Sequence, residues 1–251
     1  MLMYNLDTIL ETMRQASQEI MNIYNQDFQI TQKADNSPLT QADQISHQII
    51  KEFLEEHTPK IPIISEEDDI PDYSTRKKWK YFWLLDPLDG TKEFIDKNGQ
   101  FTINLALIQD STPILGIIQA PALDNVYWAE KGKGAFKREK LTQKIQVRKN
   151  VSQKDLVAAI SRSHLASEDK KMLEKYKIKQ TIAMGSALKF CLLAEGKADF
   201  YYRFNPTMEW DTAAGQILVE EAGGVVLDEY GKTFNYNKTT LLNGSFLCKS
   251  F

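Results

Sequence analysis

The spacing of hydrophobic residues predicts that the chain begins with two helices and continues with a block of strands. Apolar residues recur every three to four positions over residues 6–23 and 40–57, which is typical of amphipathic helices. Apolar runs that favour strands follow at residues 61–64, 83–85, 101–108, 114–121, 125–129 and 134–136. Because the later runs follow one another without a helical pattern between them, they predict an antiparallel sheet.

Strands and helices alternate in the second part of the chain. Strand-like runs occupy residues 156–160, 180–184, 198–203 and 225–227, and a terminal strand closes the predicted fold. Helical patterns occupy residues 167–175, 188–193 and 207–222, and the glycines that follow the last of them are a typical helix stop. This alternation predicts an α/β half with a mixed sheet. A lysine-rich passage at 137–152 predicts the boundary, so we expect an α+β protein with halves at residues 1–150 and 151–251.

One apolar run ends abruptly in a turn that carries two carboxylates. An unpaired carboxylate at the edge of a hydrophobic layer is costly unless a cation or several hydrogen bonds compensate it. The side chains of Asp86 and Asp89 and the carbonyl of Leu88 offer oxygen ligands that suit a hard cation. The backbone amides of Gly90 and Thr91 suit a phosphate beside that cation.

Three further acids lie where they could join this turn. Glu66 emerges first from a short apolar strand, although the acids that follow it are typical of a solvated loop. Asp43 and Asp211 each fall in the first turn of a predicted helix, where complementation of the helix dipole would explain either residue. For Asp43 the alternative is a catalytic or substrate-positioning role. Together with Asp86, Asp89 and Glu66, Asp211 becomes the fourth carboxylate of a predicted Mg²⁺ site.

Composition and charge exclude several classes of protein. The chain has 42% hydrophobic and 26% charged residues, which is typical of a globular protein, and it has no apolar run long enough to predict a transmembrane segment. Its two cysteines are too few for a disulfide framework and fit a reducing compartment. A net charge of −3 gives no basic surface for a nucleic acid polymer. The polar N-terminus is unlike a signal peptide, so we expect a cytoplasmic protein.

Three acidic motifs resemble the signature of a known family. They are the strand followed by Glu66-Glu67, the run Asp86-Pro87-Leu88-Asp89-Gly90-Thr91, and Trp210-Asp211-Thr212-Ala213-Ala214-Gly215 in the last helix. This set is similar to that of the lithium-sensitive, Mg²⁺-dependent phosphatases, which include inositol monophosphatase and fructose-1,6-bisphosphatase. Residues 33–43, 86–94 and 185–196 resemble most the branch of 3′(2′),5′-bisphosphate nucleotidases. The resemblance implies a layered αβαβα sandwich with an antiparallel N-terminal sheet and a mixed C-terminal sheet.

The resemblance also implies roles for the acidic residues. Glu66, Asp86 and the Leu88 carbonyl would hold one Mg²⁺, and Asp86, Asp89 and Asp211 would hold a second. The family implies two or three Mg²⁺ ions in each site and inhibition by Li⁺. Thr91 would hydrogen-bond the attacking water with Glu66 or Glu67 nearby, and Asp43 is a further catalytic candidate. The amides of Gly90 and Thr91 would cradle the phosphate that is removed.

Residues in the second half are candidates for binding the remainder of the substrate. Two places could hold a nucleotide and its second phosphate. One is Lys189, in a helix that begins at Gly185 and Ser186, and the other is the run at residues 161–164, where a strand ends. The candidates are Ser161, Arg162, Ser163, His164, Gly185, Ser186, Lys189 and Arg203. Arg162 and His164 could equally be surface residues. Tyr202 departs from the proline that relatives usually carry before Arg203, which leaves the local backbone open.

The function that follows is hydrolysis of the 3′-phosphate of adenosine 3′,5′-bisphosphate, or of its 5′-phosphosulfate analogue, by water activated between two metals. The expected partner is a small nucleotide, with the protein a monomer or weak homodimer. Peripheral association with the cytoplasmic face of the inner membrane stays open. The alternatives are an inositol monophosphatase-like phosphatase of sugars or polyols and a non-catalytic regulator that binds Mg²⁺ or nucleotide. The regulator is disfavoured because no ligand position of the signature is lost.

Overall fold

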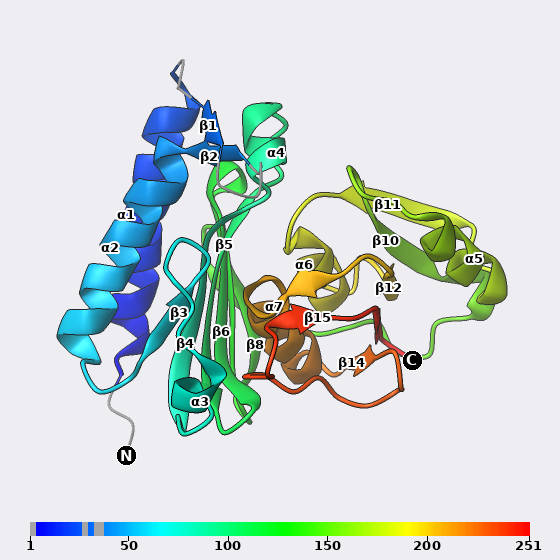
Figure 1. The fold of residues 1–251 in the computed structure, drawn as a ribbon. Coiled ribbons are helices and arrows are strands. Elements are labelled where there is room, and N and C mark those ends of the chain that lie inside the picture. Colours follow the sequence, from blue (N-terminus) through cyan, green and yellow to red (C-terminus); the bar gives the residue numbers. More distant parts are fainter. Residues whose placement is uncertain (1–3, 27–29, 33–37) are drawn as a thin grey trace.

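The computed structural model describes residues 4–26, 30–32 and 38–251. Two long helices, α1 (Leu6–Tyr24) and α2 (Gln41–His57), lie side by side on one face of the large sheet (Figure 1). The Asn5 side chain caps α1 by accepting from the Asp7 amide at 3.0 Å. Residues three to four positions apart are buried along α1, as its sequence pattern predicts, so this helix packs by one apolar face.

The large sheet has seven strands in sequence order. They are β3 (Ile63–Ser65), β4 (Tyr81–Asp89), β5 (Thr102–Gln109), β6 (Thr112–Ala120), β7 (Asn125–Glu130), β8 (Gly134–Arg138) and β9 (Thr142–Ile145). Pairing is antiparallel from β4 to β9, as expected, whereas β3 runs parallel to β4. The parallel pair brings the carboxyl ends of β3 and β4, and therefore their acidic residues, to the same edge.

The second sheet is mixed and lies beyond a layer of two helices. Its strand order is β11 (Gln180–Met184), β10 (Val157–Ser161), β12 (Phe200–Arg203), β16 (Phe246–Lys249) and β14 (Val225–Asp228). Its first three strands are parallel and its last three are antiparallel. Helices α6 (Leu188–Ala194) and α7 (Glu209–Glu221) separate the two sheets, and α5 (Ser167–Lys175) covers the outer side (Figure 1). The expected αβαβα sandwich is confirmed.

Close packing around α7 joins the two halves. A Cβ atom at Gly215 would lie 2.4 Å from the Phe190 ring on α6, and one at Gly116 on β6 would lie 2.5 Å from Ile217 on α7. One hydrophobic cluster accordingly contains strand residues such as Leu84 together with Phe190 and Ile217. The division at residue 150 stays a prediction, since apolar packing is continuous across it.

Short elements and one strand were not predicted from the hydrophobic pattern. β9 lies inside the passage at 137–152 that we expected to be a boundary. We did not predict it because an exposed polar edge strand lacks an apolar signal. The small elements are α3 (Tyr73–Arg76), α4 (Thr91–Ile95), two 3₁₀ turns (Pro121–Leu123 and Gln153–Asp155), and the pairs β1 (Ile30–Gln32) with β2 (Pro38–Thr40) and β13 (Thr207–Met208) with β15 (Leu242–Asn243).

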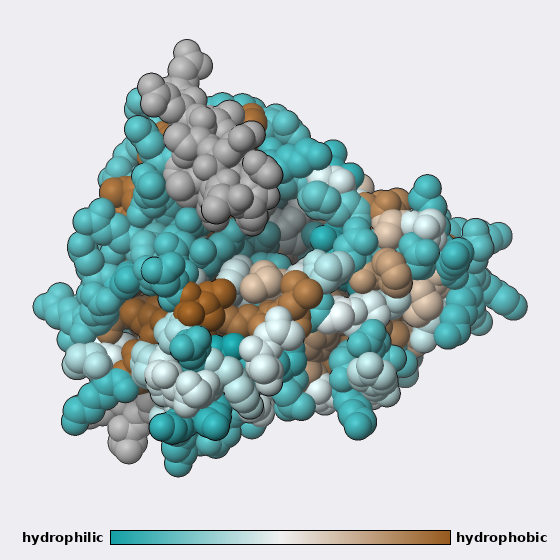
Figure 2. All heavy atoms as spheres, viewed as in Figure 1, coloured by the Kyte–Doolittle hydropathy of each residue, from teal (hydrophilic) through white to brown (hydrophobic). Residues whose placement is uncertain are grey.

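The face seen in Figure 1 is largely hydrophilic (Figure 2). Figure 2 shows that hydrophobic residues on the face seen in Figure 1 gather in a band across its middle. Within the described ranges, no helix is both long and apolar enough to cross a membrane.

Candidate active site

A cavity of about 400 Å³ opens where the ends of both sheets meet the first turns of three helices. Its lining comes from the end of β4 and from α4, from the ends of β10 and β12, and from the starts of α6 and α7. Ten of the predicted site residues line it: Glu66, Asp89, Gly90, Thr91, Ser161, His164, Ser186, Lys189, Arg203 and Asp211. The volume is sufficient for a small phosphorylated molecule.

Acidic residues gather at one end of this cavity. Asp86 is 1% exposed and lies on β4, which continues to Asp89 through an irregularity in its pairing with β5 instead of ending before Asp86. Pro87 has no amide proton for the ladder, which explains the irregularity. Burial and the negative charges of Glu66, Asp89 and Asp211 raise the pKa of Asp86 well above its usual value.

Asp89 is held by hydrogen bonds from both halves of the chain. Its Oδ2 accepts from the Asn104 side chain at 3.2 Å, the Ser186 hydroxyl at 2.8 Å and the Ala187 amide at 2.7 Å. The left-handed backbone of Ser186, at φ 54°, belongs to the turn that aims these donors at Asp89. Asp89 therefore ties the end of β4 to the first turn of α6.

Asp211 enters the cavity from the first turn of α7. Its Oδ2 accepts from the Met208 amide at 2.8 Å, so it also caps the helix, as the dipole explanation predicts. Although Asp211 keeps some exposure toward the cavity, burial and the charge of Asp89 raise the pKa of Asp211 well above its usual value. Capping and membership of the acidic cluster are thus compatible roles for one carboxylate.

The residues present fit a hard divalent cation. The acidic end supplies only oxygen donors, including the Leu88 carbonyl, which lies 3.4 Å from the Thr91 hydroxyl. The raised pKa values of Asp86 and Asp211 indicate negative charge that nearby protein cations do not balance. Among the described residues, no three acidic, histidine or cysteine side chains already converge into a finished metal cluster. The fit therefore rests on the donor set and on its excess charge.

Thr91 connects the acidic end to α2. Its hydroxyl lies 3.4 Å from Asp43 Oδ1, and Asp43 is buried near the start of α2. The Ser46 hydroxyl, one turn further along, donates to the Pro87 carbonyl at 2.7 Å, which holds this helix against the acidic turn. Thr91 follows Gly90, whose φ of 91° places it in the left-handed region that glycine adopts without strain.

Two basic residues, Lys189 and Arg203, also line the cavity, and we call this part its basic end. Lys189 is buried and donates from Nζ to the carbonyls of Ser186 at 2.6 Å and Met184 at 3.3 Å. Burial lowers the pKa of Lys189 to about 8. Arg203 donates to the Ser161 hydroxyl at 3.4 Å. These cations could receive an anionic group of a substrate whose reacting phosphate lies at the acidic end.

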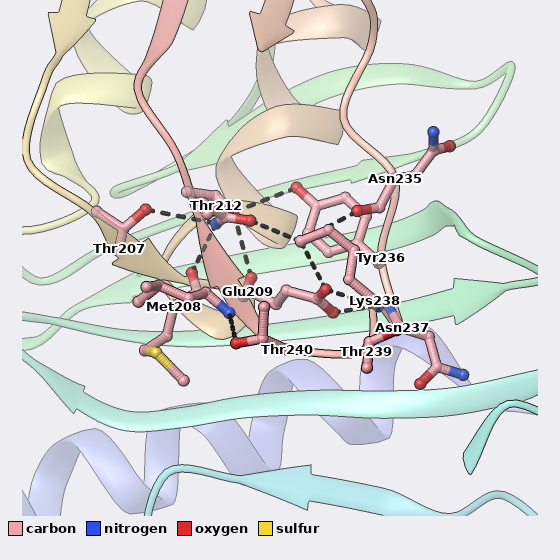
Figure 3. A network of polar contacts seen from close by, with 12 residues as sticks. Thr207, Met208, Glu209, Thr212, Asn235, Tyr236, Asn237, Lys238, Thr239 and Thr240 are labelled. Carbon is pink, nitrogen blue, oxygen red and sulfur yellow. Dashed lines mark hydrogen bonds and ion pairs between the residues drawn. The ribbon is translucent and has the colours of Figure 1, made fainter. Parts of the chain in front are cut away.

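A network of polar contacts surrounds the start of α7 (Figure 3). Glu209 Oε1 accepts from Lys238 Nζ at 2.6 Å, and Glu209 Oε2 accepts from the Asn237 amide at 2.7 Å. Asn243 accepts from Lys238 at 2.8 Å and donates to Thr212 at 3.0 Å. Because Thr212 lines the cavity, this network links the 235–243 segment to the site.

Comparison with known proteins shows the family. The model of the inositol monophosphatase family matches residues 4–250. The chain is 44% identical over 247 residues to the 3′(2′),5′-bisphosphate nucleotidase CysQ of Escherichia coli K12, which covers 96% of this chain and 98% of that protein. It belongs to the inositol monophosphatase family.

Solved structures of the family have the same fold. A crystal structure of CysQ from Bacteroides thetaiotaomicron is 37% identical, with a TM-score of 0.85 over 96% of this chain and 95% of that one. The Thermotoga maritima IMPase is 27% identical, with a TM-score of 0.82 over 98% of this chain and 91% of that one. The similarity of fold and the sequence identity to CysQ therefore indicate the same family.

Several predicted site residues lie outside the cavity lining. Glu67 lines a separate hollow beside α2. Arg162 Nε donates to Gln100 Oε1 at 2.8 Å, the Ser163 hydroxyl donates to Glu93 Oε1 at 2.6 Å, and the Gly185 amide donates to Gln100 at 2.8 Å. Asp86, Leu88 and Asp43 are buried and are not among the lining residues. Residues 33–37 of the branch-specific passage at 33–43 lie outside the described residues.

The cavity also has lining residues that the sequence did not suggest. They are Lys92, Glu93, Ala187, Phe190, Tyr201, Thr207, Thr212 and Phe246. Tyr201 could have been found, because it is two positions from Arg203 on β12 and therefore shares its face. Glu93 could have been found within the branch-specific passage at 86–94. Phe246 carried no local signal, since only the sheet order brings β16 beside β12.

Proposed function

We propose that this protein is an Mg²⁺-dependent phosphatase that removes the 3′-phosphate of adenosine 3′,5′-bisphosphate, giving AMP and phosphate. The 5′-phosphosulfate analogue would be a second substrate. The observation that carries the proposal is one cavity with an acidic end, Glu66, Asp89 and Asp211, and a basic end, Lys189 and Arg203. Such a cavity suits a molecule with one reacting phosphate and a second anionic group. The similarity to CysQ proteins over nearly the whole chain supports this substrate class.

Each acidic residue has a role in this proposal. Glu66, Asp86 and the Leu88 carbonyl would hold one Mg²⁺, and Asp86, Asp89 and Asp211 would hold another. Bound Mg²⁺ would lower the pKa of a water and neutralise the leaving oxygen of an in-line displacement. Thr91 would orient that water. Asp43 lies 3.4 Å from the Thr91 hydroxyl. It would orient this hydroxyl and accept its proton, so that Thr91 can accept a proton from the water.

The basic end would select the substrate. Lys189 and Arg203 would bind the second phosphate as charged donors, with Ser161 and His164 beside them. The apolar faces of Phe190, Tyr201 and Phe246 would pack against the nucleoside. A substrate with a single phosphate would leave the buried charge of Lys189 without an anion, so it should bind more weakly.

A hydrolysis panel tests the proposal. With Mg²⁺ present, we expect adenosine 3′,5′-bisphosphate to have a higher kcat/KM than inositol 1-phosphate or fructose 1,6-bisphosphate. Equal or faster turnover of inositol 1-phosphate would support the inositol monophosphatase-like alternative instead. Absence of hydrolysis for all three, with Mg²⁺ bound, would favour the non-catalytic regulator.

Other expectations extend this proposal. We expect Li⁺ to inhibit turnover by replacing one Mg²⁺, and two or three Mg²⁺ ions to bind in each site. Titration of activity with each ion would measure both properties. The cytoplasmic location, the peripheral membrane association and the monomer or weak homodimer stay predictions.

A further inference from the structure

Two side chains of the first half hold the turn that follows β10 in the second half. Glu93 on α4 accepts from the Ser163 hydroxyl at 2.6 Å, and Gln100 accepts from the Arg162 side chain at 2.8 Å. Gln100 also accepts from the Gly185 amide at 2.8 Å. We name these three contacts the clasp. They join the passage at 93–100 to the turns on both sides of the basic end of the cavity.

Steric fit makes the clasp tight. A Cβ atom at Gly185 would lie 2.8 Å from Glu93 Cγ and 2.6 Å from the Gln100 carbonyl, so glycine is required for this approach. Glu93 is 4% exposed although it carries a carboxylate. A hydroxyl that donates to a buried carboxylate forms a short, charge-assisted hydrogen bond, which is stronger than one between neutral groups. Glu93 therefore supplies the buried, charge-assisted contact of the clasp.

The clasp holds a turn whose other residues face the substrate cavity. The His164 amide donates to the Ser161 hydroxyl at 3.1 Å, which closes residues 161–164 into one compact turn. Ser161 in turn accepts from Arg203 at 3.4 Å. Both Ser161 and His164 line the cavity, whereas Ser163 points to Glu93. Ser163 thus shares one compact turn with Ser161 and His164, and Ser161 contacts Arg203 on β12.

We propose that Glu93 is a positioning residue that tethers Ser163 and so sets the geometry of the subsite for the second, non-reacting phosphate. This inference rests on the proposed function and adds a residue that selects substrates with two phosphates. Glu93 would act on binding more than on the chemical step, because the residues of the tethered turn that line the cavity are Ser161 and His164, and neither is a proposed metal ligand.

The test compares Glu93→Ala, Ser163→Ala and the double variant. We expect each single variant to raise KM for adenosine 3′,5′-bisphosphate by about tenfold while kcat changes by less than about threefold. The double variant should resemble the single variants, because both remove the same contact. Glu93→Gln keeps an acceptor for the Ser163 hydroxyl, so its KM should return toward that of the wild type. The matched control is Ser167→Ala, which removes an exposed hydroxyl near the same turn.

A second substrate distinguishes positioning from general damage. For p-nitrophenyl phosphate, which has one phosphate, we expect KM of every variant to stay within about twofold of the wild-type value. Equal losses on both substrates, additive effects in the double variant, or a fall in kcat alone would overturn the proposal. If a thermal melt shows that Glu93→Ala does not fold, the test rests on the KM values of Ser163→Ala and Glu93→Gln for the bisphosphate. If the wild type does not hydrolyse the bisphosphate, the proposed function and this inference are both rejected. If the wild type hydrolyses it but the variants do not show the expected rise in KM, only the inference is rejected.

Discussion

Two carboxylates in the first turn of α7 have opposite surroundings. Glu209 is 0% exposed and is neutralised by Lys238 at 2.6 Å, with backbone amides as further donors. Asp211, two residues later, points into the cavity and keeps a pKa well above its usual value. In the described part of the chain, no lysine or arginine forms an ion pair with Asp211. The helix thus carries one compensated and one uncompensated acid.

Two lysines show the same contrast. Lys238 faces Glu209, whereas Lys189 is buried in the cavity and bonds to carbonyls of Met184 and Ser186. A charge that the protein neutralises itself contributes to the fold. A buried charge without a protein partner costs stability and is retained where a ligand supplies the opposite charge. The network therefore contains its own counter-charge, the Glu209–Lys238 pair, whereas in the cavity a ligand would provide the counter-charge for Lys189.

Asp211→Asn tests the uncompensated acid and has the largest expected effect. Loss of one carboxylate from the acidic end should lower kcat by about a thousandfold, or about 4 kcal/mol in activation free energy. Without Mg²⁺, the variant should melt at the same temperature as the wild type or higher, because a repelled carboxylate has been removed. Steady-state kinetics and thermal melts measure the two results.

A matched substitution in the same turn separates function from fold. Glu209→Gln should show the reverse pattern, a lower melting temperature with kcat of the folded protein changed by less than about tenfold. If Asp211→Asn keeps its activity, the metal roles proposed for the acidic end are wrong. If it destabilises the protein without Mg²⁺, its carboxylate is compensated after all.

The acidic end could be predicted from the sequence because its residues lie close together along the chain or in a recognisable motif. Asp86 to Thr91 are consecutive at the junction of β4 and α4, and only Glu66 and Asp211 had to be brought to them. Adjacent parallel strands β3 and β4 explain the position of Glu66. The hydrophobic periods likewise predicted most helices and strands, since these elements bury one face or both.

Lys238→Met tests the compensated pair and has the next largest effect. It leaves Glu209 buried with its backbone donors alone, so the free energy of unfolding should fall by about 3 kcal/mol. Lys238 is 32% exposed, which places the loss at the lower end for buried pairs. Urea unfolding measures the change. Lys171→Met is the control, because its exposed, solvent-screened pair with Glu168 should contribute little to stability. Equal losses in both variants would contradict the contrast.

The side-chain contacts that hold the 161–164 turn, and the Glu209 network, could not be predicted in this way. Glu209 and Lys238 are far apart in the sequence, and neither belongs to a hydrophobic period that would predict their pairing. Arg162 and Ser163 follow a strand like ligand-binding residues, yet their side chains bond to Gln100 and Glu93. Contacts between side chains from separate elements depend on tertiary packing, which the local pattern does not encode.

The last prediction uses pH to test the uncompensated lysine. Burial, opposed by Asp89 and assisted by Arg203, brings the pKa of Lys189 to about 8. Glu93 and Asp211 also face it and favour its charged form. As pH rises from 7 to 9 the ammonium loses its proton, so kcat/KM for adenosine 3′,5′-bisphosphate should fall by about tenfold relative to p-nitrophenyl phosphate. Taking this ratio removes the ionisations that both substrates share.

Lys189→Arg supplies the control, because a guanidinium stays charged over this range. Its ratio of kcat/KM values should not change between pH 7 and pH 9, even if altered geometry lowers both rates. Identical pH profiles for the two substrates in the wild type would show that Lys189 does not bind the second phosphate. If this ratio of kcat/KM values falls with pH in the wild type and stays constant in Lys189→Arg, the second phosphate of the substrate is the counter-charge of Lys189.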